Sequence, residues 1–172
     1  GQTFKKVWWD TNLGRQCSQF VRAEDFIVAP ESKDLQTSPR YTHIIRMPRN
    51  DFNKYVKAGW YMPTDFVGES MDPAGQTVGE IEGVDTDSED AQDEIMTLLE
   101  MHVYELFDGI DEEDPEDDNA VAVPYVVTID YDNEKIVSIR RNWEEDDENK
   151  KRRDWFVSYK FLPGLGFYGF GL

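Results

Sequence analysis

The side chains best suited to nucleophilic or acid–base chemistry are scarce in this chain: two histidines, His43 and His102, and one cysteine, Cys17. A catalytic nucleophile needs a base beside it and a third group that orients the base. Each histidine lies in a strand-like stretch, and no HxxxH or HExxH spacing supplies zinc ligands. Cys17 lacks the context of a thiol nucleophile, so we interpret it as a structural strand residue. We therefore assign no catalytic residue, no cofactor-binding residue and no metal ligand, and we expect no enzyme activity.

Carboxylates are the abundant candidate ligands, because 36 Asp and Glu stand against 18 Lys and Arg for a net charge of −18. Residues 85–119, the acidic insertion, contain sixteen acids and no base. The remaining 20 acids and all 18 bases lie in the rest of the sequence. Asp85, Asp87 and Glu89 alternate as an EF-hand loop begins, but Asp90 stands where that loop needs glycine. The pattern favours a solvated acidic face over a calcium site.

Three glycines near the end of the chain, Gly164, Gly166 and Gly169, match the G-x-G-x-x-G pattern of dinucleotide-binding proteins. That motif requires a helix at its third glycine and an acidic residue about 20 positions later. Here bulky aromatic residues such as Phe167 interrupt the glycines, and the chain stops at Leu172. We interpret the run as an aromatic, glycine-rich linker rather than a nucleotide site, and we expect the chain to be a piece of a longer polypeptide.

The elements that must position these residues are mostly strands, because β-branched and aromatic residues alternate between turn signals. The predicted strands cover residues 3–9, 15–22, 26–28, 40–46, 101–107, 121–130, 135–143 and 155–162. Helical spacing predicts one helix over 50–58, ended by Gly59, and another over about 88–100. The fold class is therefore α+β, with mostly antiparallel strands and two or three short helices in a single domain, 1–172, that carries the acidic insertion at about 85–119.

Two charged connections are predicted to be solvated loops. Residues 111–118 combine like charges with Pro115, so we expect a solvated loop there. We expect 88–107 to be ordered against the domain and about 110–119 to be a mobile loop with no function of its own. Residues 144–153 place five acids before four bases, and we expect a hairpin tip whose two halves neutralise each other.

The composition excludes some protein classes. A content of 39% hydrophobic and 13% aromatic residues supports a folded core rather than an acidic tail. No apolar run approaches the roughly 18 residues of a membrane-spanning helix, so we expect no membrane association. A net charge of −18 disfavours DNA binding by this chain, since phosphate neutralisation needs clustered Lys and Arg.

Several stretches resemble, in their order and spacing, the N-terminal part of tailed-bacteriophage portal proteins, the head–tail connectors. They are residues 2–7, 23–28, 39–43, 124–130, 136–143 and 159–172. The strongest is YKFLPGLGFYGFGL at 159–172, which in those proteins precedes the helices leading towards the central ring. The resemblance covers nearly the whole chain except for the region around 68–94 and the acidic loop.

The resemblance implies a structural, non-enzymatic role in the virion, at the capsid portal vertex, with assembly in the host cytoplasm. Portal proteins form a homo-oligomeric ring, usually a dodecamer, through which DNA is packaged and ejected. The implied partners are other portal subunits, terminase, capsid and scaffold, and tail adaptor proteins. This chain would be the wing region, so DNA would pass through parts of the polypeptide beyond Leu172, and no DNA-contacting residue is carried over.

Two other classes of function remain open from the residues themselves. An acidic interaction module, such as a DNA mimic, would bind a basic partner through carboxylates spaced like phosphates on one rigid face. A metal-dependent enzyme would need carboxylates and a histidine that converge in a pocket.

Overall fold

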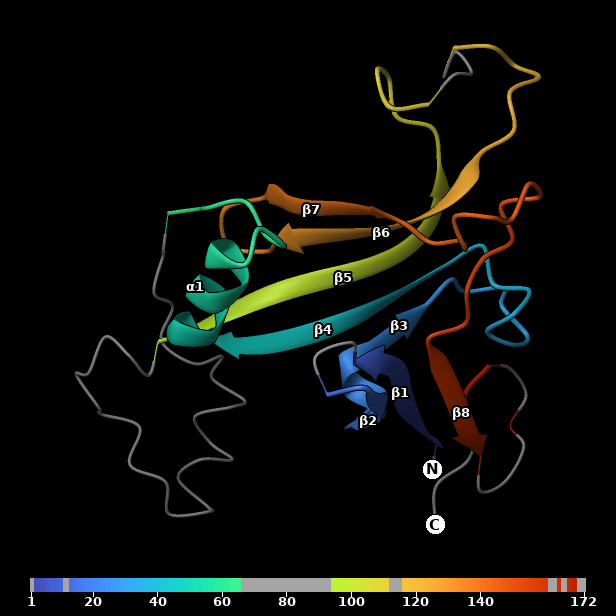
Figure 1. Cartoon of the computed structure of the whole chain (residues 1–172). Coiled ribbons are helices and arrows are strands. Elements are labelled where there is room, and N and C mark those ends of the chain that lie inside the picture. Colours follow the sequence, from blue (N-terminus) through green and yellow to red (C-terminus); the bar gives the residue numbers. More distant parts are fainter. Residues whose placement is uncertain are drawn as a thin grey trace. The chain divides into compact units, whose positions relative to one another are not determined.

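The chain is built mostly from antiparallel strands arranged in two sheets (Figure 1). The computed structural model describes residues 2–10, 13–65, 94–111, 116–160, 164 and 167–169. One sheet has the strand order β2-β1-β8, formed by β2 (Arg15–Val21), β1 (Gln2–Asp10) and β8 (Phe156–Lys160). The other has the order β3-β4-β5-β6-β7, formed by β3 (Phe26–Val28), β4 (Arg40–Pro48), β5 (Ile95–Glu105), β6 (Val123–Asp130) and β7 (Lys135–Arg141).

Among the described residues, the helical content is smaller than the sequence predicts. Within the described residues there is one α-helix, α1 (Arg49–Lys57), and a single 3-10 turn, η1 (Ala23–Asp25). No helix among them is long and apolar enough to cross a membrane. The α+β class with mostly antiparallel strands is therefore confirmed. The expected second helix, over about 88–100, is not found in its described residues, 94–100.

The strands and connections gather into two compact units. Unit 1 comprises residues 1–44, 101–126 and 140–172, and unit 2 comprises 45–100 and 127–139. The long strands β4, β5 and β6 contribute residues to both units. The expectation of a single domain stays a prediction.

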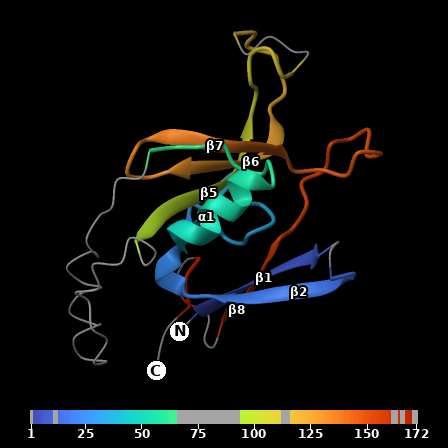
Figure 2. The same cartoon turned by 60° about the vertical axis from the view of Figure 1, so that its left-hand side comes forward.

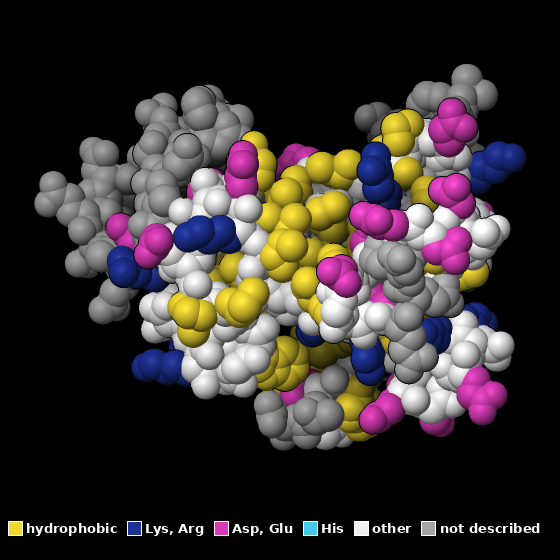
Figure 3. All heavy atoms as spheres, turned by 90° about the horizontal axis from the view of Figure 1, so that it is seen from above, with side chains coloured by type: hydrophobic (Ala, Val, Ile, Leu, Met, Phe, Trp, Pro, Cys, Tyr) yellow, Lys and Arg dark blue, Asp and Glu magenta, His cyan; other side chains and the backbone are white. Residues whose placement is uncertain are grey.

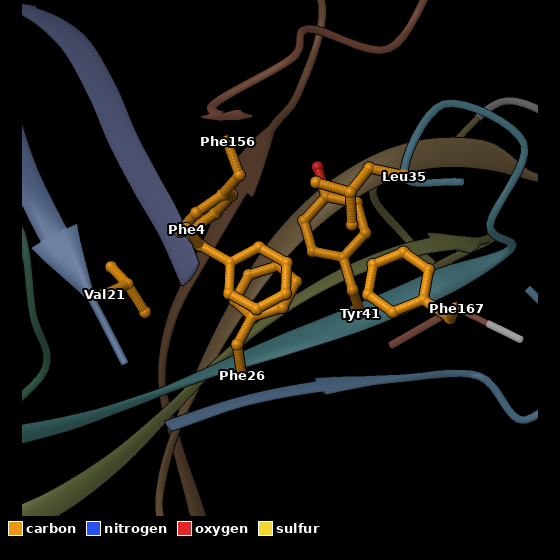
Figure 4. Packing of buried hydrophobic residues seen from close by; sticks show 7 residues of the cluster. All are labelled: Phe4, Val21, Phe26, Leu35, Tyr41, Phe156 and Phe167. Carbon is orange, nitrogen blue, oxygen red and sulfur yellow. The ribbon is translucent and has the colours of Figure 1, made fainter. Parts of the chain in front are cut away.

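Unit 1 has an aromatic core formed where strand alternation turns every second side chain inward. In β1, Gln2 and Phe4 are buried while Thr3 and Lys5 are exposed, as expected for a sheet with one face on the core. Phe4 stacks on Phe26 with ring centroids 4.2 Å apart. Figure 4 shows these rings converging with the rest of the cluster, which consists of Phe4, Val21, Phe26, Leu35, Tyr41, Phe156 and Phe167.

Unit 2 is organised around α1, whose buried residue Phe52 stacks on Tyr61 at 5.6 Å. These two residues pack with Met96 and Leu98 from β5 and with Val137 from β7. The helix ends where predicted, because Gly59 adopts a φ of +75° and its N–H donates to the Val56 carbonyl oxygen at 3.0 Å. The predicted helix over 50–58 is confirmed.

The predicted helix over 88–100 is wrong for residues 95–100, which belong to the eleven-residue strand β5; residues 88–93 lie outside the described residues. Along β5 the buried positions recur every second residue, at Met96, Leu98, Glu100 and His102. Two of these inward residues are polar, so the alternation was hidden from a hydrophobicity pattern. The strand predicted over 101–107 is confirmed as far as Glu105.

The connection over 144–153 is not the tip of a hairpin, because β7 is the edge of the five-stranded sheet and β8 pairs with β1. The expected neutralisation between its halves is confirmed by the ion pair of Arg153 with Glu144 at 3.1 Å. Its solvation is only partial, since Arg152 is buried.

Candidate interaction surface

The two histidines lie close together in unit 1, although no motif links them in the sequence. His43 on β4 and His102 on β5 are both buried, and their rings lie 5.5 and 5.4 Å from the ring of Phe156. Tyr41 stacks on His102 at 4.7 Å. Because both histidines are buried and in contact with aromatic rings, they belong to the core. Aromatic pairs at such distances contribute about 0.5–1.5 kcal/mol each.

Cys17 lies on β2 opposite Trp8 and is partly buried, as expected of a structural strand cysteine. Across the part of the chain that the structure describes, no group of three or more His, Cys, Asp or Glu side chains could hold a metal ion. The EF-hand-like residues 85–90 lie outside that part. The expected absence of metal, cofactor and catalysis stays a prediction.

Arg152 is a buried cation that the sequence did not single out. Its guanidinium donates hydrogen bonds to the carbonyl oxygens of Leu35, Gln36 and Ser38 at 2.6, 2.8 and 2.7 Å. It also lies 5.2 Å from the ring of Tyr41, within the range of a cation–π contact. The four bases at 150–153 look alike in the sequence, and nothing in that run shows which one enters the core.

The loop that Arg152 holds, residues 29–39, is also ordered by its own short polar side chains. Asp34 accepts hydrogen bonds from the backbone N–H and the hydroxyl of Thr37 at 2.7 and 2.8 Å. These bonds hold the pKa of Asp34 below its usual value. Ser32 and Ser38 share a hydrogen bond of 2.7 Å. Arg152 thus fixes a connection that already has a defined local conformation.

The base of the acidic connection between β5 and β6 is also anchored. Tyr125 donates its hydroxyl hydrogen to Asp111 at 2.7 Å, and the Phe107 backbone N–H donates to the same carboxylate at 2.8 Å. Burial of Tyr125 and its bond to Asp111 raise the pKa of Tyr125 to about 12. The prediction of a fully solvated loop over 111–118 is therefore wrong for Asp111, and residues 112–115 lie outside the described residues.

The glycine-rich run near the C-terminus packs on the core where it is described. Phe167 belongs to the aromatic cluster, the Tyr168 hydroxyl donates to the Phe26 carbonyl oxygen at 2.9 Å, and the Gly169 N–H donates to Gln2 at 3.0 Å. A Cβ atom at Gly164 would collide with the Tyr168 carbonyl oxygen. The interpretation as a linker is wrong for residues 167–169, because their side chains and backbone are bound to β1 and β3.

The three-stranded sheet has a second face, which carries exposed apolar side chains. Figure 2 shows β1, β2 and β8 side by side. In their register Lys5 lies opposite Phe20 and Val157, and Thr3 lies opposite Tyr159, so these side chains project from one face. Phe20 is 64% exposed and Tyr159 55% exposed. Trp9 and Val157 are also exposed. By the same alternation the outer face consists of Thr3, Lys5, Val7, Trp9, Gln16, Ser18, Phe20, Val157 and Tyr159.

A hollow of about 340 Å³ lies on this outer face. It is lined by Thr3, Phe4, Lys5, Phe20 and Tyr159, so aromatic rings from the two edge strands flank β1. Ligand pockets of proteins usually occupy roughly 300–1,000 Å³, which makes this hollow large enough for an apolar side chain of a partner.

The charge of this sheet differs from that of the whole chain. Its three strands contain four bases, Lys5, Lys6, Arg15 and Lys160, and a single acid, Asp10. Asp10 lies opposite Arg15 in the register of β1 and β2, and both positions belong to the inner face of the sheet. The outer face therefore carries a lysine and no acid, although the chain has a net charge of −18.

Unit 2 also exposes apolar side chains, among them Trp60, Met62 and Ile136. Figure 3 shows hydrophobic side chains gathered in the middle of another view of the molecule, between scattered charges of both signs. The outer face of the three-stranded sheet has a hollow with defined walls, and we therefore take it as the candidate surface.

Comparison of the sequence with protein-family models and with curated proteins finds no match. The portal hypothesis therefore depends on the order and spacing of the stretches within the sequence itself.

Proposed function

We propose that this chain is a structural component of a phage portal ring at the capsid vertex, where it forms the wing region and acts through protein–protein contacts. Each of the six stretches that resemble portal proteins contributes to a regular element: β1, η1 with β3, the start of β4, β6, β7 and β8. The sixth begins in β8 and continues into the core residue Phe167. The resemblance thus falls on the residues that build the fold.

The observation that carries a contact function is the outer face of the three-stranded sheet. A sheet face with exposed Trp9, Phe20 and Tyr159 buries little of its apolar area in an isolated chain. Contiguous apolar patches with aromatic residues and few charges are typical of protein–protein interfaces. This composition supports an assembly role better than a catalytic one.

The partners under this proposal are the neighbouring portal subunits, terminase, capsid and scaffold proteins, and tail adaptors. DNA is packaged and ejected through other parts of the polypeptide. The acidic charge of this chain fits that division, since a negative surface repels DNA at long range.

The DNA-mimic alternative receives less support from the described part of the acidic insertion. Glu100 is buried on β5, and Asp111 is committed to Tyr125 and Phe107. These two carboxylates do not belong to an exposed, phosphate-like array.

Labelling of virions tests the portal role. An antibody raised against residues 1–172 should mark one capsid vertex of the phage that encodes the chain, as seen by electron microscopy. The complete gene product should form rings in negative stain. An antibody against the major capsid protein is the matched control and should mark all faces. Label distributed over the whole capsid, or absent from virions, would contradict the proposal.

A further inference from the structure

We propose that the outer face of the three-stranded sheet binds the acidic connection between β5 and β6 of a second copy of this chain. This connection, named here the acidic arm, consists of the described residues 105–111 and 116–122. The inference deepens the proposed structural role and rests on it only for the expectation that copies of the chain meet. The contact is heterologous, because two different surfaces of identical chains pair.

The acidic arm has the charge that the outer face lacks. The described residues of the arm contain six acids and no base, whereas the outer face of the three-stranded sheet carries Lys5 and no acid. Opposite charges on two surfaces steer encounter and fix orientation more than they add affinity. The segregation of charge within unit 1 therefore supplies complementarity between copies.

The arm also presents apolar anchors beside its acids. Ile110 is 46% exposed and Val121 is 67% exposed. Ile110 lies next to Asp111, whose hydrogen bonds to Tyr125 and Phe107 hold the base of the arm in place. An aliphatic side chain of this size fits a hollow between Phe20 and Tyr159, and the flanking carboxylates then approach Lys5.

The geometry favours contact between copies rather than within one. Ile110 and Val121 on the arm, and Phe20 and Tyr159 on the outer face, are all exposed in a single chain. Repeated heterologous contacts build either a closed ring or an open filament. One pair of surfaces per chain is thus sufficient for a multi-subunit assembly.

Complementation between two variants of the 172-residue chain tests the contact. The face variant, Phe20→Asp with Tyr159→Ser, keeps the arm; the arm variant, Ile110→Ser with Asp108→Lys, keeps the face. All four side chains are exposed, so both variants should fold, which circular dichroism checks. By sedimentation, each variant alone should be monomeric, and an equimolar mixture should form a heterodimer that grows no further.

The wild-type chain should associate weakly, and raising the salt from about 0.05 to about 0.5 M should weaken that association roughly tenfold. The variant Met62→Ser, which removes an exposed apolar side chain from unit 2, is the control and should associate like wild type. Self-association of the arm variant alone would show that the outer face pairs with itself and would overturn the proposal. A wild-type chain that stays monomeric at about 1 mM would overturn it as well.

Failure of this contact and failure of the portal role are distinguishable. If the complete gene product carrying the face variant still forms rings, the contact is wrong and the portal role stands. If the variants complement each other but virions carry no label at a vertex, the contact stands and the portal role is wrong.

Discussion

Two charged connections of unit 1 use their charges in different ways. The connection over 144–153 contains acids and bases, pairs Glu144 with Arg153, and inserts Arg152 into the core. The acidic arm contains acids and no base, and its Asp111 accepts a hydrogen bond from the buried Tyr125. A charge with a partner inside the fold contributes to folding, whereas a local surplus of one sign of charge attracts a partner outside the chain. Four experiments can break or sharpen this comparison.

The largest effect is expected at Arg152. The change Arg152→Met leaves the carbonyl oxygens of Leu35, Gln36 and Ser38 without their donor and should lower the free energy of unfolding by about 3 kcal/mol, because hydrogen bonds to charged groups are among the stronger ones. The free energy of unfolding of Arg152→Lys should lie between those of Arg152→Met and wild type, since ammonium lacks the planar fork of guanidinium. Urea denaturation measures each change.

The matched control is Arg153→Ala, whose guanidinium is exposed and pairs with the exposed Glu144. We expect a loss below about 1 kcal/mol there. Equal losses at both positions would show that burial of Arg152 does not matter and would remove the contrast between the two connections.

A smaller effect is expected at the base of the acidic arm. Asp111→Ala removes the acceptor for both the Tyr125 hydroxyl and the Phe107 N–H, and should cost about 1–2 kcal/mol. The exposed Asp108, changed to Ala, is the control and should be nearly neutral. Thermal denaturation of the two variants compares them, and an unchanged melting temperature for the Asp111 variant would contradict the anchor.

The same contact predicts a dependence of stability on alkaline pH. The pKa of Tyr125 is about 12 in the folded chain, above the ordinary 10.0, so the unfolded chain releases this proton first. The stabilisation is complete below pH 10 and is lost as the pH rises from about 10 towards about 12. Tyr125→Phe should flatten this part of the stability profile, and tyrosinate absorbance should show one fewer late-titrating group. A profile identical to wild type would disprove the shift.

The smallest effect is expected from the acids that follow Asp111 in the connection between β5 and β6. Replacing residues 112–118 with a Gly/Ser linker removes six carboxylates that repel one another, while it keeps Asp111. At 0.15 M salt the screening length is about 8 Å, so the repulsion acts mainly at short range. The fold should stay intact, with a slightly higher melting temperature at low salt than wild type. A loss of folding, or a calcium-dependent rise of the wild-type melting temperature that the variant lacks, would show that these residues form a site.

The local elements were largely predictable because their signals are short-range. Gly59 marks the end of α1, and the alternation of Gln2, Thr3, Phe4 and Lys5 marks β1. The pairing of β8 with β1 joins residues more than a hundred positions apart, and no local pattern announces it. The inward placement of Glu100 on β5 likewise depends on its neighbours in space.

The candidate surface was predictable only in part. The segregation of acids into 85–119 is visible in the sequence, so the acidic arm could be anticipated. The outer face could not, because Phe20 and Tyr159 are brought to either side of Lys5 by the order β2-β1-β8. The burial of Arg152 could not be predicted for the same reason, because its hydrogen-bond acceptors lie in a loop from the first quarter of the chain.

The pairing of β8 with β1 has a consequence for synthesis on the ribosome. Phe4 and Phe26 emerge early, yet Phe156 and Phe167, which complete their cluster, are added only near the end of the described chain. Until Phe156 and Phe167 have been synthesised these aromatic rings have no finished core to enter, and a contact of such large sequence separation forms slowly. We therefore expect nascent chains that stop before Phe156 to leave Phe4 and Phe26 exposed to solvent and open to non-native contacts.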